Sequence, residues 1–169
     1  MAESDGYILY AGEYENLDDA SEDFAMIKAL HREDFVGHYE AALFTKKDNG
    51  KVKIIDTDET SRAHGAEAGA IAGAVIGVLF PPSVLLMAAG GGAVGAVIGH
   101  VSKGMPRKDI KEVGEMLDEG EAGIIFVGET TVEAGVEKLM KKSNKVMKKE
   151  IQAEADEMKA ALNEAVKAA

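Results

Sequence analysis

Residues 65–101 read GAEAGAIAGAVIGVLFPPSVLLMAAGGGAVGAVIGHV, and this glycine-rich stretch divides the rest of the chain into two parts. Residues 68–101 include no Asp, Glu, Lys or Arg, although the 169-residue chain carries a net charge of −11. Glycine recurs at every fourth position in two runs, and residues four apart stack on one face of a helix. The first run is Gly65, Gly69, Gly73 and Gly77, and the second is Gly91, Gly95 and Gly99.

Pro81 and Pro82 separate the two runs. Because proline breaks a helix, we predict a helical hairpin whose arms, residues 65–80 and 83–101, reverse at these prolines. A row of glycines gives each arm a flat groove that another helix backbone can approach closely. Glycine also lowers helix propensity by about 1 kcal/mol per residue. An uncovered hairpin in water is therefore not expected, and copies of the same hairpin are the predicted cover.

Lipid is the second environment to consider for this hairpin. A spanning helix needs about 20 residues. The second arm nearly reaches that length and the first is shorter, while Ala and Gly drive insertion only weakly. Both a membrane-embedded oligomer, such as a pore, and a closed soluble oligomer with the hairpins in its interior are compatible with the sequence.

Polar groups gather at the base of the predicted hairpin. They are Arg62, His64, Glu67, His100 and Lys103. A His–Glu–His cluster there could hold a metal or sense pH. No ligand spacing supports a metal, so we interpret the group as a polar collar and predict neither a metal nor a cofactor.

The segments on either side of the hairpin predict one α+β domain. Residues 6–12 indicate a strand, residues 16–35 a helix capped by Asn16, and residues 38–57 a β-hairpin with DNG at its turn. Residues 105–120 then indicate a helix and residues 122–128 a strand. This order is the split βαβ, or ferredoxin-like, pattern, with a four-stranded antiparallel sheet and both helices on one face. Its halves are residues 1–60 and 105–129, and residues 61–104 are the insertion.

Residues 130–169 form the fourth zone and predict a long helical tail. Thr130 and Glu133 fit a capping box, and apolar residues recur every 11 positions, which favours a nearly straight packing seam. These residues are Val136, Met140, Met147, Ile151, Met158 and Leu162. The helix either lies along its own domain or binds a helical partner. Because it extends beyond the predicted fold, we favour the partner.

Composition narrows the function classes. The chain has no Cys, which removes disulfides and thiolate catalysis. Residues 1–60 hold 15 acids and 6 bases, which argues against binding to nucleic acid. GGGAVG at residues 90–95 lacks the preceding strand of a dinucleotide site, and no residue set suggests acid–base catalysis. We therefore predict that the protein is not an enzyme.

The start of the chain lacks the pattern of an export signal. We expect a cytoplasmic protein, or one associated with the inner membrane with both hairpin ends on the cytoplasmic side.

This layout resembles a bacterial family of predicted membrane proteins, the domain of unknown function twelve-sixty-nine. The resemblance spans residues 6–129 and is most specific in HGAEAGAIAGAVIGVLFPPS (residues 64–83) and GGGAVGAVIGH (residues 90–100). It implies a glycine-zipper hairpin but no reaction and no catalytic residues. Similar hairpins occur in some stress-induced bacterial proteins.

Two functions follow as hypotheses. The first is a non-enzymatic homo-oligomer assembled through the glycine faces, as a membrane-associated pore or scaffold or as a soluble particle. The alternative is a ferredoxin-like module that senses a small molecule, a metal or pH.

Overall fold

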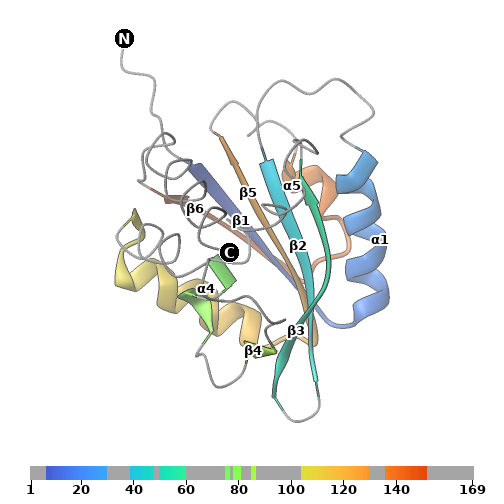
Figure 1. Cartoon of the computed structure of the whole chain (residues 1–169), viewed down its shortest axis with the longest axis horizontal. Coiled ribbons are helices and arrows are strands. Elements are labelled where there is room, and N and C mark those ends of the chain that lie inside the picture. Colours follow the sequence, from blue (N-terminus) through green and yellow to red (C-terminus); the bar gives the residue numbers. More distant parts are fainter. Residues whose placement is uncertain are drawn as a thin grey trace, which may run out of the picture.

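The computed structural model describes residues 7–29, 39–47, 50–59, 75–76, 78–80, 85–86, 104–129 and 136–151. In the first half of the chain it contains β1 (Tyr7–Tyr14), α1 (Leu17–Lys28), β2 (Tyr39–Lys46) and β3 (Val52–Glu59). The second half contains β4 (Leu85–Leu86), α4 (Arg107–Asp118), β5 (Ala122–Glu129), α5 (Val136–Leu139) and β6 (Lys145–Ile151). The α+β class is therefore confirmed (Figure 1).

The strands form one six-stranded sheet in the order β4-β3-β2-β5-β1-β6. All neighbouring pairs are antiparallel except β3 and β4, which run parallel through Val52–Leu85 and Lys53–Leu86. The central strand β5 pairs with both β1 and β2, so these two strands run parallel to each other with β5 between them, and α1 connects them. The predicted four-stranded sheet thus has an additional strand at each edge.

Local signals account for several of these elements. The side chain of Asn16 caps α1 by accepting a hydrogen bond from the Asp19 backbone N–H at 2.8 Å. The turn between β2 and β3 contains Gly50 at φ 80°, a left-handed conformation that glycine adopts without strain. The predictions of a helix after Asn16 and of a β-hairpin around DNG are confirmed within the described residues.

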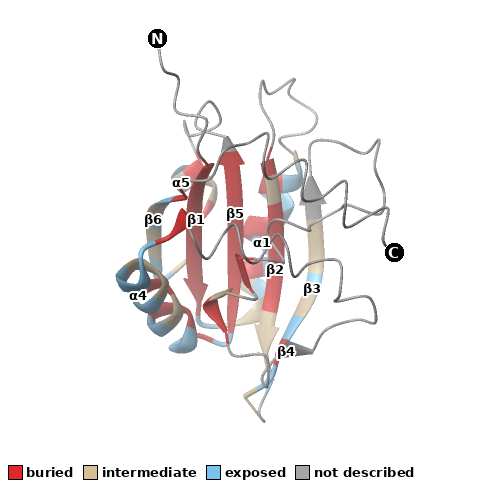
Figure 2. Ribbon diagram, turned by 60° about the vertical axis from the view of Figure 1, so that its left-hand side comes forward, coloured by how far each residue is buried: buried red, intermediate tan, exposed pale blue. Residues whose placement is uncertain are grey.

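The expected arrangement of the two helices is wrong, because α1 and α4 cover opposite faces of the sheet. Leu9, Ile125 and Val127 contact the cluster that contains α4, whereas Ile8, Ile124 and Phe126 contact the cluster that contains α1. Figure 2 shows the central strands buried along most of their length. Strands that are apolar on both faces need a layer on each side. A ferredoxin-like arrangement with both helices on one face would leave the other face uncovered.

The predicted long C-terminal helix is also wrong in the described part of the tail. Only α5 is helical, and β6 pairs with β1 along the edge of the sheet. The helical repeat is overridden because β1 offers a row of free backbone groups, and Asn144 starts the pairing by donating its backbone N–H to the Glu13 carbonyl at 2.8 Å. Lys149 of β6 then forms ion pairs with Asp109 and Glu112 of α4.

Strand β6 generates the first prediction. Replacing Ile151, which is 1% exposed, with Ala should lower the free energy of unfolding by about 2–5 kcal/mol, because it leaves a cavity in the core. The matched control is Ile55→Ala on β3, at a side chain that is 42% exposed, which should change stability by less than about 0.5 kcal/mol. Urea unfolding followed by circular dichroism measures both. Equal effects of the two substitutions would contradict the position of β6.

Candidate functional site

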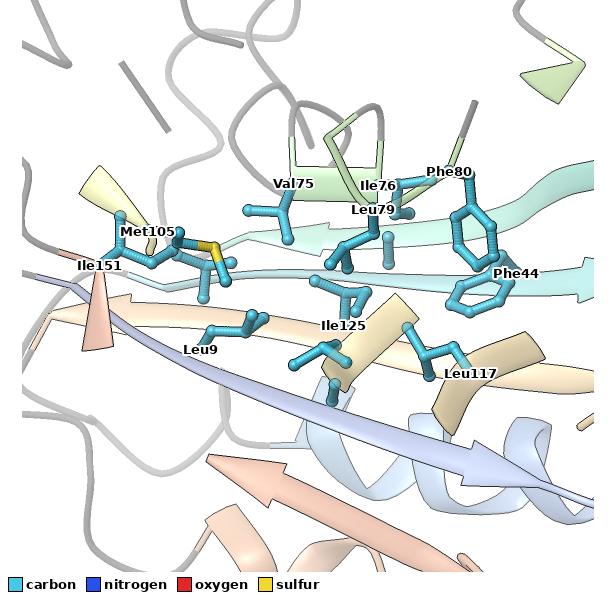
Figure 3. Close-up of a cluster of buried hydrophobic side chains, with 14 of the residues drawn as sticks. Leu9, Phe44, Val75, Ile76, Leu79, Phe80, Met105, Leu117, Ile125 and Ile151 are labelled. Atoms are coloured by element: carbon cyan, nitrogen blue, oxygen red, sulfur yellow. The ribbon is translucent and has the colours of Figure 1, made fainter. Parts of the chain in front are cut away.

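The described part of the first hairpin arm lies on the chain's own sheet. Residues 75–76 and 78–79 are α-helical, and the Phe80 N–H donates to the Ile76 carbonyl at 3.0 Å. Four large side chains are buried in the cluster shared with β1, β2, β5 and α4, and Figure 3 shows them pointing toward the strands. They are Val75, Ile76, Leu79 and Phe80. We call the sheet residues and α4 residues beneath them the seat.

Aromatic packing fixes one end of this segment on the seat. The Phe80 ring meets the Phe44 ring edge to face, with centroids 5.5 Å apart (Figure 3). The Phe44 ring in turn covers Gly123 on β5, its register partner. A Cβ at Gly123 would lie 2.7 Å from Cε1 of Phe44, which is closer than atoms can approach. Glycine at this position therefore allows Phe44 to lie flat and support Phe80.

Helix α4 also packs closely against the segment. A Cβ at Gly114 would lie 3.1 Å from the Leu79 carbonyl oxygen, so the two backbones pack closely at this point. After the two prolines, Leu85–Leu86 adds to the sheet as β4 beside β3. The second arm is thus extended at residues 85–86, and the prediction of a helix beginning at residue 83 is wrong there. The chain is held to the sheet on both sides of the prolines.

A groove of about 400 Å³ borders the seat. Its apolar wall comes from Val52, Leu79, Phe80 and Ile110, and Gly50 and Gly114 leave it open. Charged residues of α4 form its rim: Lys111, Glu115 and Asp118. Lys46 forms an ion pair with Asp118 there.

The predicted site residues have different outcomes. The seven glycines of the two runs, the prolines, the collar residues, Met158 and Leu162 lie outside the described residues. The remaining tail residues face the chain's own interior instead of a partner. Val136 and Met140 belong to the α1 cluster, Ile151 to the α4 cluster, and Met147 packs against the latter. These residues pack in the core, because the described part of the tail covers part of each face of the sheet.

A buried polar cluster at the end of β1 is the feature that sequence reasoning missed. The Tyr14 hydroxyl donates to Asp23 Oδ2 at 2.9 Å, and the Lys142 backbone N–H donates to the same oxygen at 2.8 Å. Nearby, Asn144 Nδ2 donates to Glu13 Oε1 at 3.3 Å. Asp23 and Glu13 are both 4% exposed. Buried carboxylates need hydrogen-bond donors. Because Lys142 and Asn144, in the turn before β6, supply two of these donors, the cluster holds that turn against β1 and α1.

Burial raises the pKa of the Tyr14 hydroxyl well above its ordinary value, and the neighbouring Asp23 carboxylate adds to this effect. The hydrogen bonds of this cluster stabilise the fold, and they join residues that are far apart in the sequence.

Comparison with protein families shows the family to which this chain belongs. The family model described as Protein of unknown function (DUF1269) matches residues 66–167, more than half of the chain. The chain belongs to this family. No curated protein and no solved structure matches it. The matched region differs from the expected span of residues 6–129, since it begins in the glycine-rich stretch and includes the tail.

The DUF1269 match therefore joins the glycine-rich stretch to α4, β5, α5 and β6 as one unit of sequence. Two further findings concern only the ranges that the structure describes. Within those ranges, no helix combines the length and apolarity that crossing a bilayer requires. The same residues contain no group of three His, Asp or Glu side chains placed to hold a metal.

Gly123 generates the second prediction. Gly123→Ala should displace the Phe44 ring and lower the free energy of unfolding by about 1–3 kcal/mol, as overpacking does. Gly114→Ala is the matched control, because its single contact of 3.1 Å is offset by a helix-propensity gain of about 1 kcal/mol. Chemical unfolding compares the two variants with the parent. A Gly123→Ala variant as stable as the parent would show that the Phe44 ring does not depend on this glycine.

Tyr14 generates the third prediction. Its pKa is raised in the folded state, so above about pH 10 the unfolded state releases a proton that the folded state keeps. The stabilisation from the Tyr14 hydroxyl is complete below that pH and decreases as pH rises, by at most about 1.4 kcal/mol per pH unit. Tyr14→Phe should cost about 1–3 kcal/mol at pH 7, and its difference from the parent should shrink above pH 10. A difference independent of pH would contradict the buried Tyr14–Asp23 hydrogen bond.

Proposed function

We propose that this protein is a non-enzymatic self-assembling protein whose glycine-rich segments pack against those of other copies. One observation carries the proposal: the chain's own sheet covers the large side chains of residues 75–80. The sequence gives this segment a second, glycine-rich helical face, and we propose that another copy of the chain covers it.

Helical spacing defines these two faces at about 100° per residue. The large face consists of Val75, Ile76, Val78, Leu79 and Phe80. The small face consists of Ala70, Gly73, Ala74 and Gly77. The centres of the two faces lie on nearly opposite sides of a helix with this spacing. The large face is directed to the seat, and we propose that the small face, on the opposite side of a helix with this spacing, is available to another copy.

The small face suits contact with another helix of the same kind. Without side chains beyond a methyl group, two backbones can approach closely and gain dispersion contacts along their length. A glycine-rich helix exposed to water would lose about 1 kcal/mol per glycine relative to alanine without recovering it by packing. Association therefore stabilises the segment, and the sheet serves as the rigid platform that presents it.

The attachment on both sides of the prolines favours contacts between protein copies over insertion of the hairpin into lipid. Phe80 rests on Phe44, and Leu85–Leu86 is paired with β3. A hairpin that entered a bilayer tip first would have to release both attachments. We therefore propose the oligomer with protein-covered hairpins, and the membrane-embedded form becomes an outcome of the test.

Substitution in the small face gives the fourth prediction. Gly73→Leu combined with Gly77→Leu fills the groove and should remove the glycine contact, which lowers the particle mass measured by size-exclusion chromatography with light scattering. The matched Gly73→Ala and Gly77→Ala pair should weaken assembly less, because a methyl group is smaller. Lys53→Leu, at an exposed position on β3, controls for added apolar surface.

The outcomes separate the alternatives. A parent protein that is monomeric at all concentrations would overturn the proposal. A parent protein recovered only with detergent, and retained by carbonate-washed membranes, would replace protein-covered hairpins with the membrane-embedded form.

A further inference from the structure

The outer surface of the α1 layer has two halves of opposite charge. Helices α1 and α5 lie side by side on this face (Figure 1), and Lys142 forms ion pairs with Glu22 and Asp19 where they meet. The exposed acids Glu15 and Asp18 lie on the α1 side of this seam. On the other side, Lys138 and Lys141 are exposed, in a chain whose net charge is −11.

Several of these charges are not neutralised within the chain. Lys142 has carboxylate partners on α1, whereas Lys145 and Lys149 pair with Glu119 and Asp109 on the α4 face. In the part of the chain that the structure describes, no ion pair involves Lys138 or Lys141 on the basic side, or Glu15 or Asp18 on the acidic side. The face therefore carries unpaired charge of both signs on neighbouring elements.

An apolar group lies on the acidic half. Met26 is 51% exposed on the outer side of α1, next to the exposed Ala25. The large apolar residues of the same helix, Phe24 and Ile27, are buried in the core. Met26 thus supplies a flexible apolar contact on a surface that is otherwise polar.

We infer that this face is a self-complementary docking surface for a second copy of the chain, related by a two-fold axis. Such an axis places the acidic half of each copy on the basic half of the other, because an isologous interface pairs each patch with its partner twice. Glu15 and Asp18 of one copy then meet Lys138 and Lys141 of the other, and Met26 adds an apolar contact on the acidic half. Charge complementarity favours a second copy of the chain over a polyanion as the binding partner, because the acidic half of the face would repel a polyanion.

This surface goes beyond the proposed glycine contact and adds a second interface to it. The glycine contact is dry and depends on close packing, whereas the α1–α5 contact depends on exposed charge. Exposed charge pairs weaken as the screening length falls from about 10 Å at 0.1 M salt to about 3 Å at 1 M. The two contacts therefore respond to different perturbations.

Complementary charge reversals test the inference. One variant carries Lys138→Glu and Lys141→Glu, and the other carries Glu15→Lys and Asp18→Lys. Both are made in the Gly73→Leu, Gly77→Leu background, so that only the α1–α5 contact is measured, by analytical ultracentrifugation at low salt. Each variant alone should associate about tenfold or more weakly than the background chain, because like charges face each other. An equimolar mixture should regain association and lose it again in 1 M salt.

The control variant is Lys47→Glu with Lys53→Glu, which reverses the same number of charges at the β2–β3 hairpin. It should associate as the background chain does. Circular dichroism verifies that each variant is folded. If the Lys138→Glu, Lys141→Glu variant is not, Lys138→Gln with Lys141→Gln replaces it and should still associate more weakly than the background chain. Self-association of either reversed variant at the strength of the background chain, or a mixture that stays monomeric, would overturn the inference. Loss of assembly on glycine substitution bears only on the proposed function and is measured separately.

Discussion

The need to cover both faces of β1 and β5 is the constraint on which the rest of the structure depends. Every residue of β1 is buried, and β5 supplies apolar side chains to both clusters. One layer of helices can cover only one face. The α1 face is closed by α1 and α5, and the opposite face by α4 together with residues 75–80. Residues 75–76 and 78–80 of the glycine-rich stretch are therefore part of the domain's core.

The proposed double use would explain the unusual composition of the segment. Its large side chains pack against the sheet, where the Phe80 ring contacts the Phe44 ring, which in turn covers Gly123. The proposed role of its glycines is contact with a helix of another copy, because glycine allows two helix backbones to approach closely. A hairpin that only had to enter lipid would gain more from Leu and Ile all round. Two faces of different character are the pattern expected for a helix between its own sheet and a neighbouring protein.

Local chemistry allowed part of this fold to be predicted from sequence. Asn16 and DNG specify their structures within a few residues, so α1 and the β2–β3 hairpin were predictable. The continuous apolar run in β5 also indicated burial on both faces, but the order of elements suggested a single helical layer. The strand β6 was not predictable from its own residues, since its lysines and methionine suit a helix and only pairing with β1 makes it a strand. The burial of Asp23 was not predictable either, because the backbone N–H that donates to its carboxylate belongs to Lys142, 119 residues further along the chain.

The central claim is that the large face of residues 75–80 binds the chain's own sheet while the small face meets another copy. Because the chain contains no Cys, single cysteines report these faces directly through disulfide formation, which requires Cα atoms within about 7 Å. Ala74→Cys places a thiol on the small face and Leu79→Cys places one against the seat. Under mild oxidation, the account predicts that Ala74→Cys forms a covalent dimer and Leu79→Cys does not. Cross-linking of Leu79→Cys as fast as Ala74→Cys, or no dimer from either variant, would contradict it.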